Sequence, residues 1–344
     1  MTGSGTRLLE RLGALLDEWP HPTPHHPAAL VRSLQRLCDA GLDQLPRPGG
    51  GQTLQRWQAL ATVAAQDLSL CKLYEGHTDA LAIFQHYPAQ VPAQATWGMW
   101  AAEPPQARVT LDTEQRDGSV RLHGRKAWCS GATVLSHGLL TAWNAHGEQQ
   151  LVAVALQQPG VQVTEDGWQA VGMAATQSVE ILFDGAIGQP VGPPNGYLAR
   201  PGFWQGGAGI AACWYGAASR LAETLRKHCA ERDEPHALAH LGQVDCTLTA
   251  AASALRDCAA WIDANPEADA ELPVRRVRAI VEHSASAVIE HVGRALGAAP
   301  YCRDAAAARL LADLPVFLRQ SHAERDLAAL GGLAARQPQE SWTL

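Results

Sequence analysis

The feature that most constrains the fold is a pair of long stretches, residues 208–230 and 237–262, that are rich in Ala and Leu and nearly free of helix-breaking residues. Such stretches predict long helices. The sequence Asp263-Ala264-Asn265-Pro266 turns the chain after the second stretch, and helical patterns resume at roughly 272–297 and 305–330. Four long helices with short connections predict an antiparallel bundle.

A different pattern precedes this bundle. Between about residues 94 and 192, short runs of β-branched and apolar residues, such as 108–111, 120–122, 151–155 and 179–183, alternate with turn-forming pairs such as Asp-Gly and Pro-Gly. Short strands punctuated in this way are typical of an all-β sandwich or barrel.

The N-terminal region is again helical in its pattern. Apolar residues recur at helical spacing in 5–18, 28–40 and roughly 68–84, and another helix is expected to begin near Leu54. The chain is therefore expected to be an α+β multidomain protein. The expected parts are an N-terminal helical domain (1–93), a middle β-barrel or sandwich (94–192), a C-terminal four-helix bundle (193–336) and a tail (337–344).

Charge and composition exclude several classes of function. The net charge of -7 argues against a nucleic-acid partner, because binding phosphates requires a basic face. No apolar run approaches the ~20 residues that cross a bilayer, and the N-terminal residues lack the apolar core of a signal peptide. We therefore expect a cytoplasmic protein without a membrane span.

Metal binding is not indicated by the spacing of potential ligands. The eight cysteines form no CxxC motif, and zinc sites usually show such tight spacing. His236 and His240 are spaced i,i+4 on an expected helix, but the sequence offers no evident third ligand. The sequence therefore predicts no metal site.

Three short segments resemble those of acyl-CoA dehydrogenases. Residues 124–131 (Gly-Arg-Lys-Ala-Trp-Cys-Ser-Gly) are similar to the family's Gly-x-Lys-x-Trp-Ile-Thr/Ser-Asn segment. Residues 172–178 are similar to its Gly-x-Arg-x-x-x-Thr/Ser segment, with Ala174 in place of Arg, and residues 309–313 are similar to its Arg-Leu-x-Arg-Asp stretch. The order of helices, β-domain and bundle is also that of the family. The resemblance implies the acyl-CoA dehydrogenase fold and FAD as the cofactor.

The Trp-Cys-Ser segment gives the resemblance a physical basis. A flavin ring needs a flat apolar wall and nearby hydrogen-bond donors. Trp128 can form the wall, and Ser130 can donate through its hydroxyl or its amide, with Cys129 between them. By resemblance, this segment lines the flavin. The alternative is a core Trp followed by a Ser in a turn.

Other expected cofactor contacts depart from the family pattern. Ala102 stands where the family's Thr-Glu-Pro segment has its flavin-binding Thr, so only a backbone contact can persist, and the Gly-Ser turn that normally follows is missing. By resemblance, Arg232 would reach the cofactor pyrophosphate, often across a subunit interface, and Gly297 would lie in the turn near the adenosine. These two positions imply a homo-oligomer. An exposed Arg at a helix end is the alternative reading for Arg232.

The catalytic base of an acyl-CoA dehydrogenase is missing from both places where the family has it. Those places correspond here to Gly206-Gly207 and to Gln320-Ser321-His322. The flavin-dependent monooxygenases of the same fold are similar in having a His near the second place, where an imidazole can act as acid or base near neutral pH. His322 is therefore the candidate catalytic residue, with Ser321 as its hydrogen-bond partner. A solvent-exposed helix His is the alternative.

Three functions remain open from the sequence. The first is an FAD-dependent oxidoreductase acting on an acyl thioester, such as an acyl-CoA, or on a related small molecule. The second is a flavin-dependent monooxygenase that uses His322. The third is a non-catalytic binding or scaffold protein, since a fold does not certify a chemistry. The first two allow for an electron-transfer or reductase partner.

Overall fold

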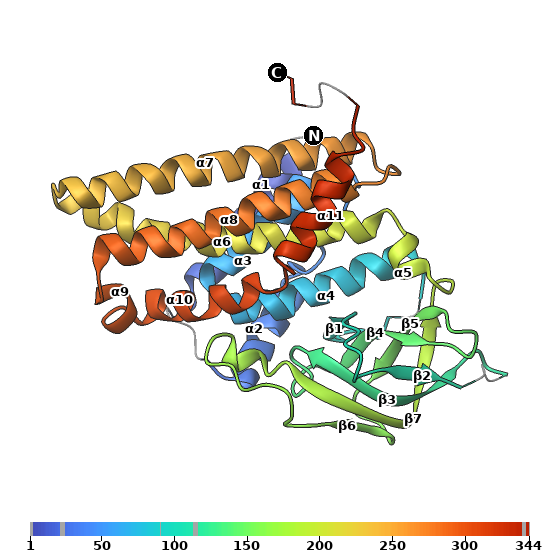
Figure 1. The fold of residues 1–344 in the computed structure, drawn as a ribbon. Helices are drawn as coiled ribbons and strands as arrows, with labels where there is room; N and C mark the ends of the chain where they lie inside the picture. Colours follow the sequence, from blue (N-terminus) through green and yellow to red (C-terminus); the bar gives the residue numbers. More distant parts are fainter. Residues whose placement is uncertain (1–2, 21–24, 90, 113–115, 339–341, 344) are drawn as a thin grey trace.

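The computed structural model describes residues 3–20, 25–89, 91–112, 116–338 and 342–343. A group of N-terminal helices is followed by a β-sheet and then by long helices, so the expected α+β architecture is confirmed (Figure 1). In Figure 1 the sheet lies below, and the long C-terminal helices form the upper layer. Helix α4 (Leu68–His86) lies between the two.

The N-terminal helices agree with the spacing of the apolar residues. They are α1 (Gly3–Asp17), α2 (Pro27–Asp39), α3 (Thr53–Gln66) and α4. Helix α2 begins with Pro27 in its first turn, where a missing amide proton does no harm. The Asp67 side chain accepts a hydrogen bond from the Leu70 amide and so caps α4.

The strands form a closed barrel. They are β1 (Trp97–Trp100), β2 (Val109–Leu111), β3 (Val120–Cys129), β4 (His137–Trp143), β5 (Gln149–Ala155), β6 (Val161–Val163) and β7 (Val179–Val191). The order β4-β2-β3-β7-β5 returns to β4, because β5 pairs with both β7 and β4. Strand β1 adds to β4, and β6 adds to β7. The barrel thus has no open edge between β4 and β5.

The C-terminal helices form the bundle. They are α5 (Gly196–Ala199), α6 (Gly202–Glu231), α7 (Pro235–Ala264), α8 (Glu271–Leu296), α9 (Ala299–Cys302), α10 (Ala305–Leu318) and α11 (Glu324–Ala334). The single helix expected over 305–330 is wrong, because the chain leaves the helix after Leu318 and starts again at Glu324. Ala323, the residue directly before α11, has a φ of 46°, which is uncommon for a residue with a side chain and interrupts the helical path.

A small apolar cluster fixes α4 to the barrel. Ile83 and Phe84 of α4 pack with Trp97, Leu139 and Leu151, and all five are buried. The Phe84 and Trp97 rings meet edge to face, with centroids 4.7 Å apart. This contact fixes the position of α4 relative to the end of β1.

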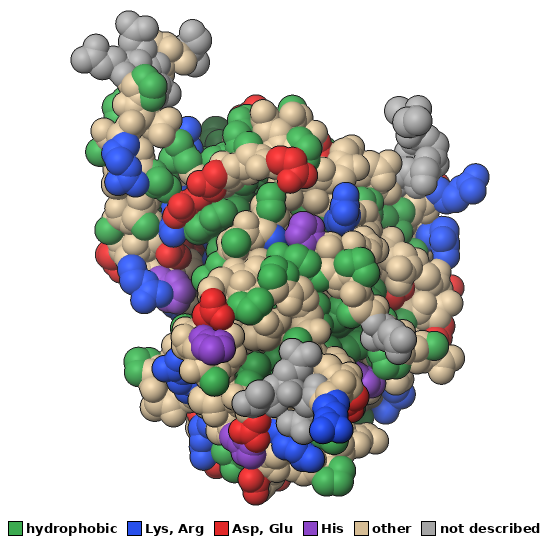
Figure 2. All heavy atoms as spheres, turned by 90° about the vertical axis from the view of Figure 1, so that its right-hand side faces the viewer, with side chains coloured by type: hydrophobic (Ala, Val, Ile, Leu, Met, Phe, Trp, Pro, Cys, Tyr) green, Lys and Arg blue, Asp and Glu red, His purple; other side chains and the backbone are tan. Residues whose placement is uncertain are grey.

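The surface on the right of Figure 1 mixes all kinds of side chain. Figure 2 shows basic, acidic and apolar side chains interspersed over this face, without a continuous area of one charge. Within the described residues, none of the helices combines the length and the apolar character that crossing a membrane requires.

Candidate functional site

A cavity of about 540 Å³ lies where α4, the first turns of α6, α8 and the α10–α11 break meet. Ala101 and Ala102, directly after β1, reach it from the barrel side. Ser321 and His322 reach it from the break between the last two helices. The structure therefore brings Ala102, Ser321 and His322, three of the residues expected from the sequence, to one cavity.

Helix α4 presents a charged face to this cavity. Lys72, Glu75 and Asp79 line it, and the Lys72 ammonium forms an ion pair with the Glu75 carboxylate. Burial raises the pKa of Glu75, although the charge of Lys72 opposes the shift. Oδ1 of Asp79 is buried and has no hydrogen-bond partner in the described part of the chain.

These carboxylates are not among the residues predicted from the sequence, because acyl-CoA dehydrogenases place their base at two other positions. The signal was present in α4: charged residues at i, i+3 and i+7 in a largely apolar helix predict one polar stripe. Asp79 is also close to one of the expected positions. A Cβ added to Gly206 would lie 3.2 Å from Asp79 Oδ1.

Two arginines face the acidic groups: Arg56 is buried and Arg278 is half-buried. Arg56 donates to the Pro46 carbonyl at 3.3 Å and to Thr78 Oγ1 at 3.4 Å. Arg278 donates to the Gly207 carbonyl at 2.6 Å. Burial lowers the pKa of both guanidiniums, against the opposing charges of nearby carboxylates. A cavity lined by buried ions suits a polar ligand better than an acyl chain.

The break between α10 and α11 positions His322. Its amide donates to Asp326 Oδ2 at 2.9 Å, and its ring Nδ1 lies 3.7 Å from the same oxygen. Burial alone would raise the pKa of Asp326, but the His322 amide and the charges of His322, Arg278 and Arg275 outweigh it and lower that pKa. Ser321 Oγ accepts from the Ala323 amide at 3.1 Å, so this hydroxyl stabilises the break.

The segment that contains Ala102 is tied to the barrel by a buried ion pair. Lys126, fully buried in β3, donates to Glu103 Oε1 at 2.7 Å and to the Thr141 carbonyl at 2.8 Å. Trp143 Nε1 donates to the other Glu103 oxygen at 3.0 Å. This network fixes the chain directly after β1, where it lines the cavity.

Trp128 lies outside the lining of this cavity. Its side chain is 54% exposed, its φ is 61°, and its indole meets Trp168 edge to face with centroids 6.2 Å apart. A left-handed backbone at a bulky residue is uncommon and turns the side chain out of the strand. The indole thus presents an open apolar face, as a wall for a flat ring requires. Cys129 is buried beside it.

The Ser130 hydroxyl belongs to a buried hydroxyl chain. Thr176 donates to the Met173 carbonyl at 2.8 Å, so it accepts from Ser178, which lies 3.0 Å away. Ser178 in turn accepts from Ser130 at 2.7 Å. The Ser130 amide donates to the Trp128 carbonyl at 3.0 Å. Both donors expected of Ser130 are therefore engaged within the protein, which leaves Ser130 Oγ as an acceptor.

Arg232 and Gly297 lie at helix ends away from the cavity lining. Arg232 is exposed at the end of α6, 3.8 Å from Glu234. Gly297 ends α8 with a φ of 62°. Their expected contacts with a cofactor and with a second subunit stay predictions.

His240 was considered from the sequence together with His236. In the structure its Nδ1 lies 2.8 Å from His291 Nδ1 of α8.

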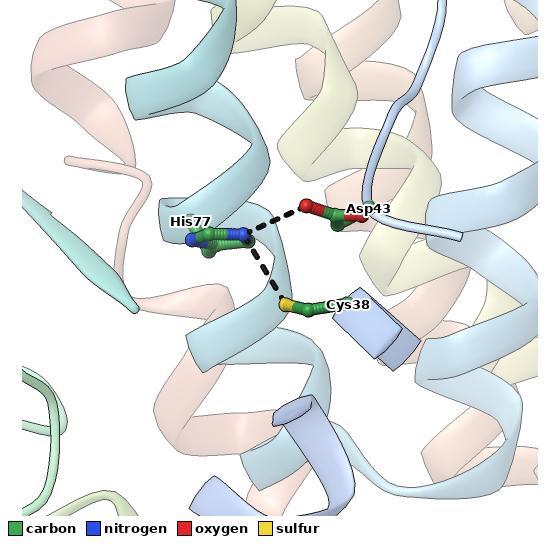
Figure 3. Close-up of side chains that lie close together, drawn as sticks. All are labelled: Cys38, Asp43 and His77. Atoms are coloured by element: carbon green, nitrogen blue, oxygen red, sulfur yellow. Dashed lines mark hydrogen bonds and ion pairs between the residues drawn. The ribbon is translucent and has the colours of Figure 1, made fainter. Parts of the chain in front are cut away.

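A second group of ligand-type side chains lies between α2 and α4. Cys38 Sγ and Asp43 Oδ2 lie 3.4 and 3.3 Å from His77 Nε2 (Figure 3). The Trp97 amide donates to His77 Nδ1 at 3.2 Å, so the ring proton is on Nε2, the nitrogen that would have to bind a metal. Burial and the charge of Asp43 raise the pKa of Cys38 to about 12. The group therefore connects α2 to α4 by hydrogen bonds.

Comparison with known proteins identifies the fold. Neither a protein-family model nor a curated protein matches the sequence. Among solved structures, the chain is similar to FMN-bound TdsC from Paenibacillus sp. A11-2, with 19% identity and a TM-score of 0.78 over 98% of each chain. Another structure of TdsC describes it as a dibenzothiophene monooxygenase.

Two further structures have the same architecture. KijD3 in complex with FMN and dTDP-3-amino-2,3,6-trideoxy-4-keto-3-methyl-D-glucose is 20% identical, with a TM-score of 0.79 over 99% of this chain and 96% of that one. A nitrososynthase from Micromonospora carbonacea var. africana is 18% identical, with a TM-score of 0.76 over 97% of each chain. The expected acyl-CoA dehydrogenase-like fold is thereby confirmed.

Proposed function

We propose that this chain is a flavin-dependent monooxygenase that acts on a polar small molecule, with His322 as its acid or base. The observation that carries the proposal is the cavity itself, which His322, Ala102 and several buried ions line together. Two similar structures hold FMN, and one similar protein is described as a monooxygenase.

The flavin is assigned to the Trp128 segment. The exposed indole offers the flat wall, Ser130 Oγ offers an acceptor, and the Ala102 backbone offers a contact toward the cavity. A bound flavin would supply the redox chemistry, passing electrons between a reductant, oxygen and substrate. The resemblance implies FAD, whereas the similar structures hold FMN. Chromatography of the cofactor released from purified protein distinguishes the two.

The residues of the chain have separate roles in this proposal. His322 exchanges a proton with the reacting group, because an imidazole can act as either acid or base. Asp326 holds the His322 segment in place through its hydrogen bond with the His322 amide. Arg278 and Arg56 supply fixed positive charge in the interior of the cavity. A separate reductase is the electron-donating partner that the proposal expects.

A test follows from the exposure of His322, which allows its replacement without loss of the core. The protein is supplied with reduced flavin, and oxygen consumption is measured with a panel of small aromatic and heterocyclic substrates. His322→Ala should lower substrate-dependent consumption by ~10²–10⁴-fold while flavin affinity stays unchanged. His146→Ala, an exposed His in the loop between β4 and β5, is the control. Equal activity of the wild type and His322→Ala would refute the role of His322.

The second candidate is dehydrogenation of an acyl thioester, and Glu75 is the specific observation in its favour. A carboxyl with a raised pKa in the cavity is a plausible general base. Bleaching of the oxidised flavin by straight-chain acyl-CoAs in stopped flow, abolished in Glu75→Gln and retained in His322→Ala, would support this reaction over oxygenation.

A further inference from the structure

Arg200 is a buried cation that has no ion-pair partner among the described residues. It follows α5 and immediately precedes the first residues of α6, and it is only 6% exposed. Its Nε is buried without a hydrogen-bond partner, and no carboxylate among the residues that the structure describes forms an ion pair with it. The guanidinium carbon lies 5.2 Å from the centre of the Tyr197 ring. A buried guanidinium is costly unless an anion pairs with it.

A second cavity, of about 210 Å³, lies beside this side chain. Arg200 lines both this cavity and the larger one. A Cβ added to Gly202 would lie 2.6 Å from the Arg200 NH1 atom, so the guanidinium reaches the backbone of the first residue of α6. Gly202 also lines the smaller cavity, and its lack of a side chain leaves that approach open.

The beginning of α6 adds a second source of positive potential. Pro201 and Gly202 line the cavity, and the first turn of this 30-residue helix contains no acidic residue and no side-chain cap. The Phe203 amide already donates to the Arg200 carbonyl at 3.0 Å, so the attraction for an anion here comes chiefly from the dipole of the helix. Arg47 and His86, both exposed, line the same cavity, and one exposed carboxylate, that of Glu267, lines it as well. Burial and the charges of Arg200 and Arg47 lower the pKa of His86, although Glu267 opposes them.

We propose that the smaller cavity is an oxyanion site, in which Arg200 and the N-terminus of α6 bind a phosphate or carboxylate group of a small molecule. The bound group neutralises the buried guanidinium from within the smaller cavity. This site is independent of the flavin assignment. Because Arg200 lines both cavities, the oxyanion can belong to a separate ion or to a molecule that extends into the larger cavity.

The first test is thermal unfolding with inorganic phosphate, compared with sodium chloride at the same ionic strength. Phosphate at ten times its Kd should raise the Tm of the wild type by about 2 °C. Arg200→Met should abolish this rise. Without phosphate, Arg200→Met should melt at the same temperature as the wild type or higher, because the substitution removes an unpaired buried charge.

Surface variants keep the test decisive if Arg200→Met folds poorly. Arg47→Ala should weaken phosphate binding several-fold and leave the Tm without phosphate unchanged. Arg303→Ala removes the same charge from an exposed position at the end of α9 and should bind phosphate as the wild type does. The proposal is overturned if phosphate, sulfate and acetate all fail to stabilise the wild type. It is also overturned if phosphate raises the Tm of Arg200→Met by as much as it raises the Tm of the wild type.

A competition experiment identifies the source of the oxyanion. If the site takes the phosphate of the flavin, inorganic phosphate and Arg200→Met will each weaken FMN binding and leave riboflavin binding unchanged. If another molecule supplies the oxyanion, the affinities for both flavins will stay the same. Provided that phosphate stabilises the wild type, both results are consistent with an oxyanion site at Arg200, and they differ only in which molecule occupies it. Phosphate binding without any flavin binding would preserve this inference and refute the proposed function.

Discussion

Lys126 Nζ lies 2.7 Å from Glu103 Oε1, and this ion pair joins the two segments that resemble flavin-binding segments of the acyl-CoA dehydrogenases. Glu103 follows Ala102 at the cavity, and Lys126 stands two residues before Trp128 in β3. The Lys side chain is fully buried and the Glu side chain is 22% exposed. The pair therefore sets how the Trp128 segment sits relative to the cavity.

Breaking this ion pair from one side should be strongly destabilising. Lys126→Met leaves the Glu103 carboxylate largely buried without its cation and should lower the free energy of unfolding by about 3 kcal/mol, measured by urea denaturation. Adding Glu103→Leu should recover part of the loss. Arg294→Met, which breaks the exposed pair with Glu290, is the control and should change stability little. If Lys126→Met lowered the free energy of unfolding no more than Arg294→Met does, Lys126 would not be paired as described.

Asp313 should make stability depend on pH. It accepts a hydrogen bond from the Met173 amide at 2.5 Å, and burial raises its pKa from 3.8 to about 6. The native state thus holds the proton more tightly than the unfolded chain. The contribution of Asp313 to stability is fully present below about pH 4 and is lost as the pH rises through 6.

Asp313→Asn should remove this dependence, because the amide keeps the acceptor for Met173 without the charge. The variant should exceed the wild type by on the order of 1–2 kcal/mol at pH 8 and should lose this advantage at pH 4. Urea denaturation at a series of pH values measures the difference. A constant difference across that range would contradict the assigned cause. Asp245→Asn, on α7, serves as the control.

Gly172 permits the close packing of the loop before Met173 on α10. A Cβ at this position would lie 1.9 Å from the Ala312 carbonyl oxygen. Gly172→Ala should therefore cost roughly 1–3 kcal/mol, since the loop or the helix must shift. Gly242→Ala, inside α7 with open space around it, should instead stabilise by up to about 1 kcal/mol. Thermal melting checks the contact: the Tm of Gly172→Ala should fall below that of the wild type, and the Tm of Gly242→Ala should rise above it.

Trp128 should contribute to flavin binding rather than to the core. Trp128→Ala should lose most flavin affinity, while the far-ultraviolet circular dichroism stays unchanged because the side chain is more than half exposed. Trp342→Ala, at another exposed Trp, is the matched control. Retention of full flavin affinity and of an unchanged flavin spectrum by Trp128→Ala would place the flavin elsewhere.

The order of helices and strands could be predicted from the sequence because periodicity and turn residues act locally. The four N-terminal helices, the barrel strands and α6 to α8 follow from the spacing of apolar residues and from breakers such as Asn265-Pro266. The break between α10 and α11 could not be predicted in this way. It depends on Ala323 in a left-handed conformation and on Asp326 holding the His322 amide, and neither leaves a sequence signal.

The sequence by itself determined the architecture and indicated Ala102, Ser321 and His322, which the structure brings to one cavity. Only the tertiary structure decided which charged groups join them. Glu75 and Asp79 come from α4, Arg278 comes from α8, and Arg200 comes from the junction before α6. The physical reason is that local patterns fix which face of a helix is polar, whereas the packing of helices against the barrel fixes what that face meets.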